Sequence, residues 1–145
     1  MLILNEKVKS ALVALSAFRE DLENPEFRAG EWASFTKSEQ GYFQMPYVVL
    51  GTTAKRFIEA GYENGWVIAD FDWSEWAQTS RAAQLRDDHE SIFTATASEL
   101  FRMLTVCIRQ DRFSEGALLE AFDSGLIKRI VQRAAILCAE LPSTT

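Results

Sequence analysis

The fold is decided by the stretch SELFRMLTVCIRQDRFSEGALLEAFDSGLIKRIVQR, residues 98–133. Apolar residues recur there at the three- and four-residue spacing of a helix face, in three successive segments. Two short breaks separate the segments, one at residues 110–114 and one at Ser124-Gly125. We therefore expect three consecutive helices, with the rest of the chain packed around them.

The first of these helices is predicted to begin near Ala97. Thr96 and Glu99 have the spacing of a capping box, in which each side chain accepts a hydrogen bond from a backbone N–H group at the helix start. The apolar residues that follow leave little of the helix surface for water, so we place this helix at the centre of the core. They are Leu100, Phe101, Met103, Leu104, Val106, Cys107 and Ile108.

The second helix is predicted to start after Ser114, which is a good N-cap residue. Glu115 would then lie favourably at the positive end of the helix dipole. Phe113 and Leu118 have the spacing of a hydrophobic staple across that helix start. Gly125 suits the left-handed residue that closes a helix.

Further helices are predicted from the same periodicity, at about Leu2 to Glu23, Pro46 to Tyr62, Trp73 to Leu85 and Leu126 to Glu140. Asn24-Pro25 combines a cap residue with a first-turn proline, which indicates a weaker helix start. Trp66–Ile68 is β-prone and open to an extended conformation. The sequence thus predicts an all-α, single-domain bundle of about five to seven helices over residues 1–145, with a short extended segment near Trp66–Ile68 left open.

Length and charge limit the class of protein. A chain of 145 residues is long enough for one domain with its own core. The net charge of −6 argues against broad affinity for nucleic acid or an anionic membrane. The charge is uneven, because residues 59–99 hold nine acids and two bases, a local charge of −7. No apolar run has the length of a membrane span, and we expect a cytoplasmic protein.

The cysteines and the histidine give no catalytic or metal pattern. Cys107 and Cys138 fall on apolar helix faces, which indicates buried free thiols in a reducing compartment, with a disulfide as the alternative. His89 stands among acids at a spacing that matches no recognised metal motif. We expect no cofactor and no metal, and binding is favoured over catalysis.

A compact group of alternating charges follows the central helix: Arg109, Asp111, Arg112 and Glu115. One interpretation is a recognition corner, because arginine presents a rigid fork of donors to a carboxylate or phosphate. The other is structural, with the two acids pairing with the arginines or capping helix ends.

A second group combines acids with aromatic residues: Asp70, Asp72, Trp73, Glu75 and Trp76. It would suit a basic partner or a cation. The structural alternative is that Asp72 and Glu75 form a capping box, Phe71 and Trp76 a staple across it, and the tryptophans are buried.

The two helices around residue 112 also have the order of a helix-turn-helix. However, the recognition helix would read EGALLEAFDS, with three acids and no base, so it would repel phosphate. Direct DNA binding is not expected.

Two blocks in the sequence are similar to a known family: YENGWVIADFDWSEW, residues 62–76, and LTVCIRQDRFSEGALLEAFDSGLIKRI, residues 104–130. They resemble DUF6508, a bacterial family of small proteins of unknown function. The resemblance covers about Pro46 to Val131 and leaves the first helix outside. It implies a shared fold and carries over no activity.

These observations favour a small acidic module that binds another protein or a ribonucleoprotein with a basic surface, without a membrane. Phage and mobile-element inhibitors, including anti-CRISPR proteins, are often compact, acidic and helical, and a negative face suits them to block a basic nucleic-acid-binding surface. The alternative is a protein or enzyme that binds a small anionic ligand through Arg109 and Arg112. A homodimer built on the amphipathic first helix is also open.

Overall fold

A computed structural model of the chain describes residues 2–33 and 46–140. Within them the chain forms eight α-helices, one 3-10 helix and a two-stranded antiparallel sheet. The elements are α1 (Leu2–Ser16), α2 (Arg19–Glu23), β1 (Gly30–Ala33), β2 (Tyr47–Leu50), α3 (Thr52–Glu63), α4 (Trp73–Ala77), α5 (Ser80–Asp87), the 3-10 helix η1 (Ser91–Thr94), α6 (Ala97–Gln110), α7 (Ala117–Asp123) and α8 (Leu126–Glu140). The predicted all-α class is confirmed, because the sheet is small and helices dominate the described chain.

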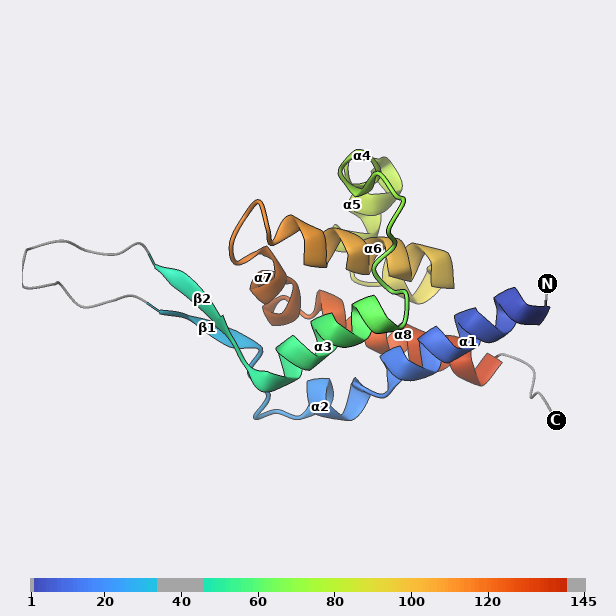
Figure 1. Cartoon of the computed structure of the whole chain (residues 1–145), viewed down its shortest axis with the longest axis horizontal. Coiled ribbons are helices and arrows are strands. Elements are labelled where there is room, and N and C mark those ends of the chain that lie inside the picture. Colours follow the sequence, from blue (N-terminus) through green and yellow to red (C-terminus); the bar gives the residue numbers. More distant parts are fainter. Residues whose placement is uncertain (1, 34–45, 141–145) are drawn as a thin grey trace, which may run out of the picture.

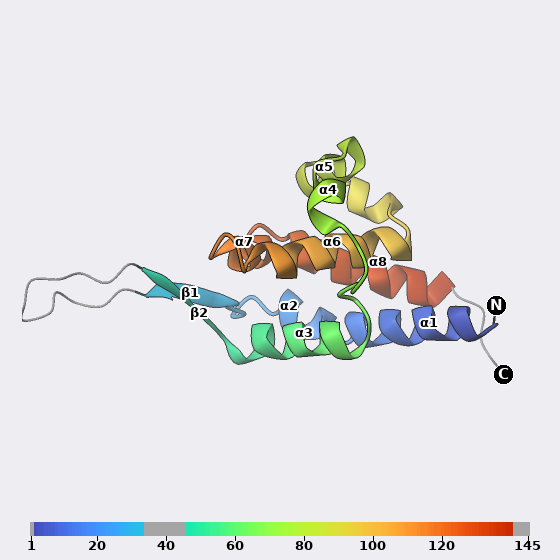
Figure 2. The same ribbon diagram turned by 45° about the horizontal axis from the view of Figure 1, so that its top comes forward.

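The helices are stacked in three tiers (Figures 1 and 2). α1 and α3 form one outer tier, α6, α7 and α8 form the middle tier, and α4 and α5 cover the other side of α6. α1 makes its most extensive contacts with α8. The β1–β2 hairpin projects from the end of this body that is nearest to α7.

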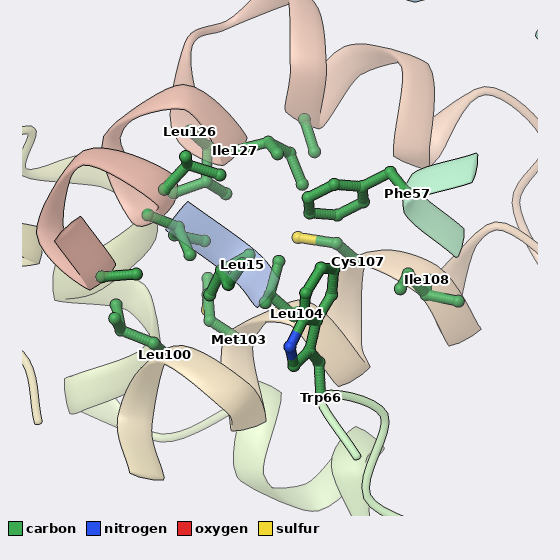
Figure 3. Packing of buried hydrophobic residues seen from close by; sticks show 14 of the residues in the cluster. Leu15, Phe57, Trp66, Leu100, Met103, Leu104, Cys107, Ile108, Leu126 and Ile127 are labelled. Carbon is green, nitrogen blue, oxygen red and sulfur yellow. The ribbon is translucent and has the colours of Figure 1, made fainter. Parts of the chain in front are cut away.

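The central position of α6 is confirmed. Thr96 and Glu99 form the predicted capping box, with both reciprocal hydrogen bonds present. Seven side chains of α6 are buried: Leu100, Phe101, Met103, Leu104, Thr105, Cys107 and Ile108. Figure 3 shows several of them packed with Leu15, Phe57, Trp66, Leu126 and Ile127, which come from other elements. A single hydrophobic cluster therefore reaches from α1 to α8.

Trp66 and Thr105 join the segment after α3 to the helices around it. Trp66 is fully buried, and its indole N–H donates to the Ala11 carbonyl at 2.9 Å. The Thr105 hydroxyl accepts from the Ile68 N–H at 3.0 Å. Trp66–Ile68 is therefore irregular backbone held by specific hydrogen bonds. The extended segment that the sequence allowed there does not form a strand.

The strand pair lies elsewhere in the chain. β1 and β2 pair with Gly30 opposite Leu50 and Ala33 opposite Tyr47. The predicted helix from Pro46 is therefore wrong over residues 46–51, since α3 begins only at Thr52. The physical reason is a run of β-prone residues at 47–49 whose pairing partner is far away in sequence. The prediction for the rest of that helix is confirmed.

Three predicted helix boundaries are also corrected. The helix expected over residues 2–23 breaks before Arg19, where the Phe18 ring turns inward to lie 5.1 Å from Phe57. No helix begins at Asn24, because its side chain accepts from the Glu26 N–H in a turn that leads toward β1. The helix expected over residues 73–85 divides in two, since the Thr79 hydroxyl caps α5 by accepting from the Ala82 N–H.

Candidate functional site

The α6–α7 turn, residues 111–116, contains three of the four residues of the predicted charged corner. The Asp111 carboxylate accepts from the N–H groups of Gly116 and Leu118, each at 3.1 Å. It therefore caps the start of α7 from five residues upstream. Of the two interpretations of Asp111, the structure provides the capping contacts of the structural one.

The predicted N-cap Ser114 is wrong. The turn of α6 continues beyond Gln110, whose carbonyl accepts from both the Phe113 and Ser114 N–H groups. α7 consequently begins later, with Gly116 as its N-cap in a left-handed conformation at φ 97°. This shift also removes the predicted staple, because Phe113 is no longer next to the cap.

Glu115 anchors the hairpin to the helical body. Its carboxylate accepts from the Val48 N–H of β2 at 3.2 Å. Beside it, the Trp32 side chain of β1 lies so close to Gly116 that any Cβ there would overlap the ring. The α6–α7 turn thus positions both strands, a role that sequence periodicity does not reveal.

The two arginines of the corner are not neutralised by its acids. In the part of the chain that the structure describes, neither Arg109 nor Arg112 forms an ion pair. Arg112 is exposed, whereas the Nε atom of Arg109 is buried without a hydrogen-bond partner. Pairing within the corner, the other structural possibility, is therefore wrong.

Phe113 is the residue that sequence reasoning assigned to the wrong place. Its side chain is 78% exposed, and its ring centroid lies 5.9 Å from that of Trp73 at the start of α4. The two predicted groups are thus brought together through a residue that was expected to pack on Leu118. A sequence signal existed in Gly116, since a glycine immediately before ALLEAF is consistent with a later helix start.

The surroundings of Trp73 are acidic and exposed. Asp72 caps α4 by accepting from the Glu75 N–H at 3.1 Å, and this bond lowers the pKa of its carboxyl group. Asp70 and Glu75 are exposed as well. We call the set of Asp70, Asp72, Trp73, Glu75 and Phe113 the aromatic–acidic surface.

Trp76 faces the body of the protein instead. It is half-buried against the core, with its ring 6.0 Å from that of Phe71 as the predicted staple requires. The Arg102 guanidinium of α6 lies over the Phe71 ring, 5.7 Å from its centroid. This layer fixes α4 on α6 and so fixes the position of Trp73.

A cleft of about 540 Å³ lies between α5, α6 and α7. Its walls include four alanines, Ala77, Ala82, Ala117 and Ala121, and its rim includes Gln110 and Glu120. None of the residues predicted for a site lines it, and no residue of the first sequence block, 62–76, lines it either.

Residues 8–140 match the model of a protein family, DUF6508, which is described as a family of unknown function. The chain belongs to the DUF6508 family. The match begins at Val8, within α1, so it extends into the first helix that the resemblance left outside. No curated protein matches the chain, and no solved structure matches it.

In this DUF6508 protein the two blocks that carried the resemblance are joined physically. Thr105, in the second block, hydrogen bonds to Ile68 in the first, and Phe113 contacts Trp73 across the same boundary. Their order in the sequence therefore corresponds to one packed unit.

The acids of residues 59–99 are only partly paired in this DUF6508 chain. Arg81 holds Glu99 through two hydrogen bonds of 2.6 and 3.1 Å, and this lowers the pKa of Glu99 to about 2. Arg86 holds Asp87 in a similar way at 3.0 and 3.2 Å. Within the described residues, the exposed acids Asp70, Asp72, Glu75, Asp88 and Glu90 have no ion-pair partner.

The thiols and possible metal ligands of the DUF6508 chain show no catalytic arrangement among the described residues. Cys107 and Cys138 are both free, as predicted, and burial raises the pKa of Cys107 to about 12. Residues 2–33 and 46–140 contain no group of three or more His, Cys, Asp or Glu side chains placed to hold a metal ion. No helix in these ranges has both the length and the apolar character to cross a membrane.

Proposed function

We propose that this protein binds another protein or a ribonucleoprotein that presents a basic surface, and that it acts by binding without catalysis. The observation that carries this proposal is Phe113, which is 78% exposed and lies against Trp73, a residue that follows Asp72 in the chain. Large aromatic side chains contribute much of the binding energy at protein interfaces. Exposing one costs free energy in the isolated protein, and a partner that covers the ring recovers it.

Charge supplies the selectivity in this proposal. Asp70 and Glu75 lie within three residues of Trp73 in the chain, and both are exposed. Asp88 and Glu90 extend the same charge beyond α5. A surface of one sign steers a partner of opposite sign into contact and disfavours partners of like charge. A basic partner with an apolar or aromatic residue inside its basic surface fits best.

In finer terms, we propose a cytoplasmic inhibitor of the kind that phage and mobile elements encode, such as an anti-CRISPR protein. Its negative face would occupy a basic surface that otherwise binds nucleic acid. Support comes from the net negative charge of residues 59–99. The acids of α7, Glu120 and Asp123, also make a direct contact of this helix with DNA unfavourable.

The test is affinity capture from the native host, followed by measurement of the dissociation constant for the captured partner. Three versions are compared: wild type, Phe113→Ala, and the charge reversal Asp70→Lys with Glu75→Lys. We expect each variant to weaken binding about tenfold or more, and the wild-type affinity to fall as salt is added.

The matched controls change similar groups away from the surface. Tyr62→Ala removes another exposed aromatic ring, and Glu6→Lys with Glu26→Lys changes the net charge by the same amount. Equal affinity of the wild type and the Asp70/Glu75 reversal, or the absence of any partner that the wild type retains, would contradict the proposal.

A small anionic ligand remains the alternative function, and one observation favours it. The buried Nε of Arg109 has a hydrogen available and no acceptor among the described residues. An anionic metabolite bound there would raise the melting temperature, and Arg109→Lys would reduce that rise because lysine lacks the planar fork. A panel of carboxylates and phosphates in a thermal-shift assay tests this.

The homodimer is a separate proposal with a narrower basis. Leu12 and Leu15 of α1 are buried within the chain's own core, so its apolar face is occupied. Val13, which is exposed on α1, is the residue that a second copy would cover. Light scattering on the wild type and on Val13→Lys tests for a dimer that the substitution dissociates.

A further inference from the structure

The 540 Å³ cleft between α5, α6 and α7 has the size of a small-molecule site. Small side chains line it from two helices: Ala82 on α5, and Ala117 and Ala121 on α7. Val106 and Cys107 of α6 contribute apolar surface to its lining. The cleft is therefore a hollow with a largely apolar wall, as ligand sites commonly are.

The polar groups at the rim differ in whether they are already in use. Arg86 and Asp87 hold each other through two hydrogen bonds. The Ser124 hydroxyl donates to the Ala121 carbonyl at 3.3 Å. The side chains of Gln110 and Glu120, in contrast, have no hydrogen-bond partner among the described residues. These two are the groups that remain available to a ligand.

The charge of the lining selects the sign of that ligand. The cleft is lined by one base, Arg86, and two acids, Asp87 and Glu120. The Arg86 charge is neutralised by Asp87 through two hydrogen bonds along one edge of the guanidinium, which leaves Glu120 as the net charge. A carboxylate accepts hydrogen bonds only, and the Gln110 side chain offers a carbonyl oxygen beside its amide.

We propose that this cleft binds a small organic cation, an alkyl- or arylammonium whose apolar body lies on the alanine-lined wall while its ammonium group donates to Glu120 and to the Gln110 carbonyl. This site is separate from the aromatic–acidic surface, because neither Trp73 nor Phe113 lines it. It also differs from the anionic-ligand alternative, since Arg109 and Arg112 are absent from its lining.

The test uses three unbranched six-carbon probes that differ in the head group: n-hexylammonium, hexan-1-ol and n-hexanoate. Each is titrated into the uniformly ¹⁵N-labelled protein while backbone amide signals are followed by NMR. We expect saturable shifts with n-hexylammonium at the amides of α6 and α7 that border the cleft. Hexanoate should bind about tenfold more weakly or not at all, because it meets Glu120 with a like charge.

Two variants locate the binding. Glu120→Gln keeps the shape and removes the charge, and should weaken n-hexylammonium binding about tenfold. Ala117→Leu fills the cleft and should abolish binding of all three probes. Its control is Ala83→Leu, on α5 at a position outside the cleft lining, which should leave the affinity unchanged. Circular dichroism verifies that every variant is folded.

Several results would overturn the inference. They are equal affinity for n-hexylammonium and n-hexanoate, unchanged affinity in Glu120→Gln, or the absence of saturation by n-hexylammonium up to about 10 mM. If Ala117→Leu does not fold, the comparison of wild type with Glu120→Gln still decides. None of these outcomes depends on whether the aromatic–acidic surface binds a protein.

Discussion

Glu99 performs two tasks with one carboxylate. It completes the capping box of α6 by accepting from the Thr96 N–H, and it accepts two hydrogen bonds from Arg81 of α5. The ion pair is partly sheltered, with 20% of the Glu99 side chain exposed. The result is a link between α5 and the start of the central helix that depends on one negative charge.

That link predicts a specific loss of stability in acid. The hydrogen bonds from Arg81 lower the pKa of Glu99 from 4.5 to about 2. Because the native pKa lies below the unfolded one, the stabilisation is present above about pH 4.5 and is lost as the pH falls toward 2. After allowance for solvent screening it is worth about 2 kcal/mol.

Urea unfolding of the wild type and of Glu99→Gln across that pH range measures the effect. The difference between the two unfolding free energies should shrink as the pH falls, while Glu63→Gln, at an exposed position, should show no such convergence. A constant difference from pH 6 to pH 2 would show that the charge of Glu99 has no part in stability.

Gly116 predicts a second effect at the residue scale. Its φ of 97° is strained for any residue with a Cβ, and a Cβ there would also overlap Trp32. We expect Gly116→Ala to lower the free energy of unfolding by about 2–4 kcal/mol, the sum of backbone strain and a displaced ring. Gly65→Ala separates the two causes, since φ is 78° there and nothing lies within 4 Å, so it should cost only about 1–2 kcal/mol. Equal losses in the two variants would mean that the Trp32 contact contributes nothing.

At the scale of single elements, α7 depends on a cap supplied from outside the helix. Asp111→Ala removes the acceptor for two N–H groups and should lower the unfolding free energy by about 1–2 kcal/mol. Asp123→Ala is the matched control, because that carboxylate lies at the C-terminal end of α7, where its charge opposes the dipole. Thermal unfolding should therefore show a lower midpoint for the first variant only. The same midpoint in both would exclude Asp111 as the cap.

The connection between α3 and α4 depends on one buried hydroxyl. Thr105 is fully buried and accepts from the Ile68 N–H while its own hydrogen points toward the carbonyl of Phe101 or Trp66. Thr105→Val keeps the shape and leaves the Ile68 N–H without its acceptor, so we expect a loss of about 1–3 kcal/mol. Hydrogen exchange at the Ile68 amide should accelerate in this variant and remain slow in Thr53→Val, where the hydroxyl has no described partner. An unchanged exchange rate in Thr105→Val would rule out that bond.

Elements with a local cause were predictable from sequence, and elements with a distant cause were not. The capping box at Thr96 marks the start of α6 and the left-handed Gly125 follows the end of α7, and both were predicted from neighbouring residues. β2 forms because residues 47–50 meet residues 30–33, a pairing that periodicity within a short window cannot register. Periodicity also does not register the cap of α7, because the Asp111 carboxylate accepts from the N–H group of Gly116, five residues further along the chain.

At the scale of the whole molecule, one hydrophobic cluster includes residues of α1, α3, α6, α7 and α8. This predicts a single cooperative unfolding transition and one domain. Far-UV circular dichroism and tryptophan fluorescence should give coincident denaturation curves, since buried Trp66 contacts the same cluster that supports the helices. Two separated midpoints would indicate that α4 and α5 unfold independently.

The candidate site shows what a sequence reveals about a whole surface. The sequence named the charged group and the acidic–aromatic group but did not predict that they meet. The structure places Trp73 and the α6–α7 turn side by side as one surface. Phe113 was assigned to a staple with Leu118 because the start of α7 was placed two residues too early. The cleft was missed because alanines carry no chemical signal until the helices that bear them face one another.

Those alanines also bear on how such proteins diversify. Ala77 and Ala117 line the cleft while remaining only half-buried, so a larger residue there changes the shape of the hollow without displacing the core. An alanine codon is a single base change from valine, threonine or glutamate. New binding preferences can therefore arise at these positions by drift and be selected directly, with no compensating repair of the fold, whereas a change at Trp66 or Leu104 would be purged before it could be tested.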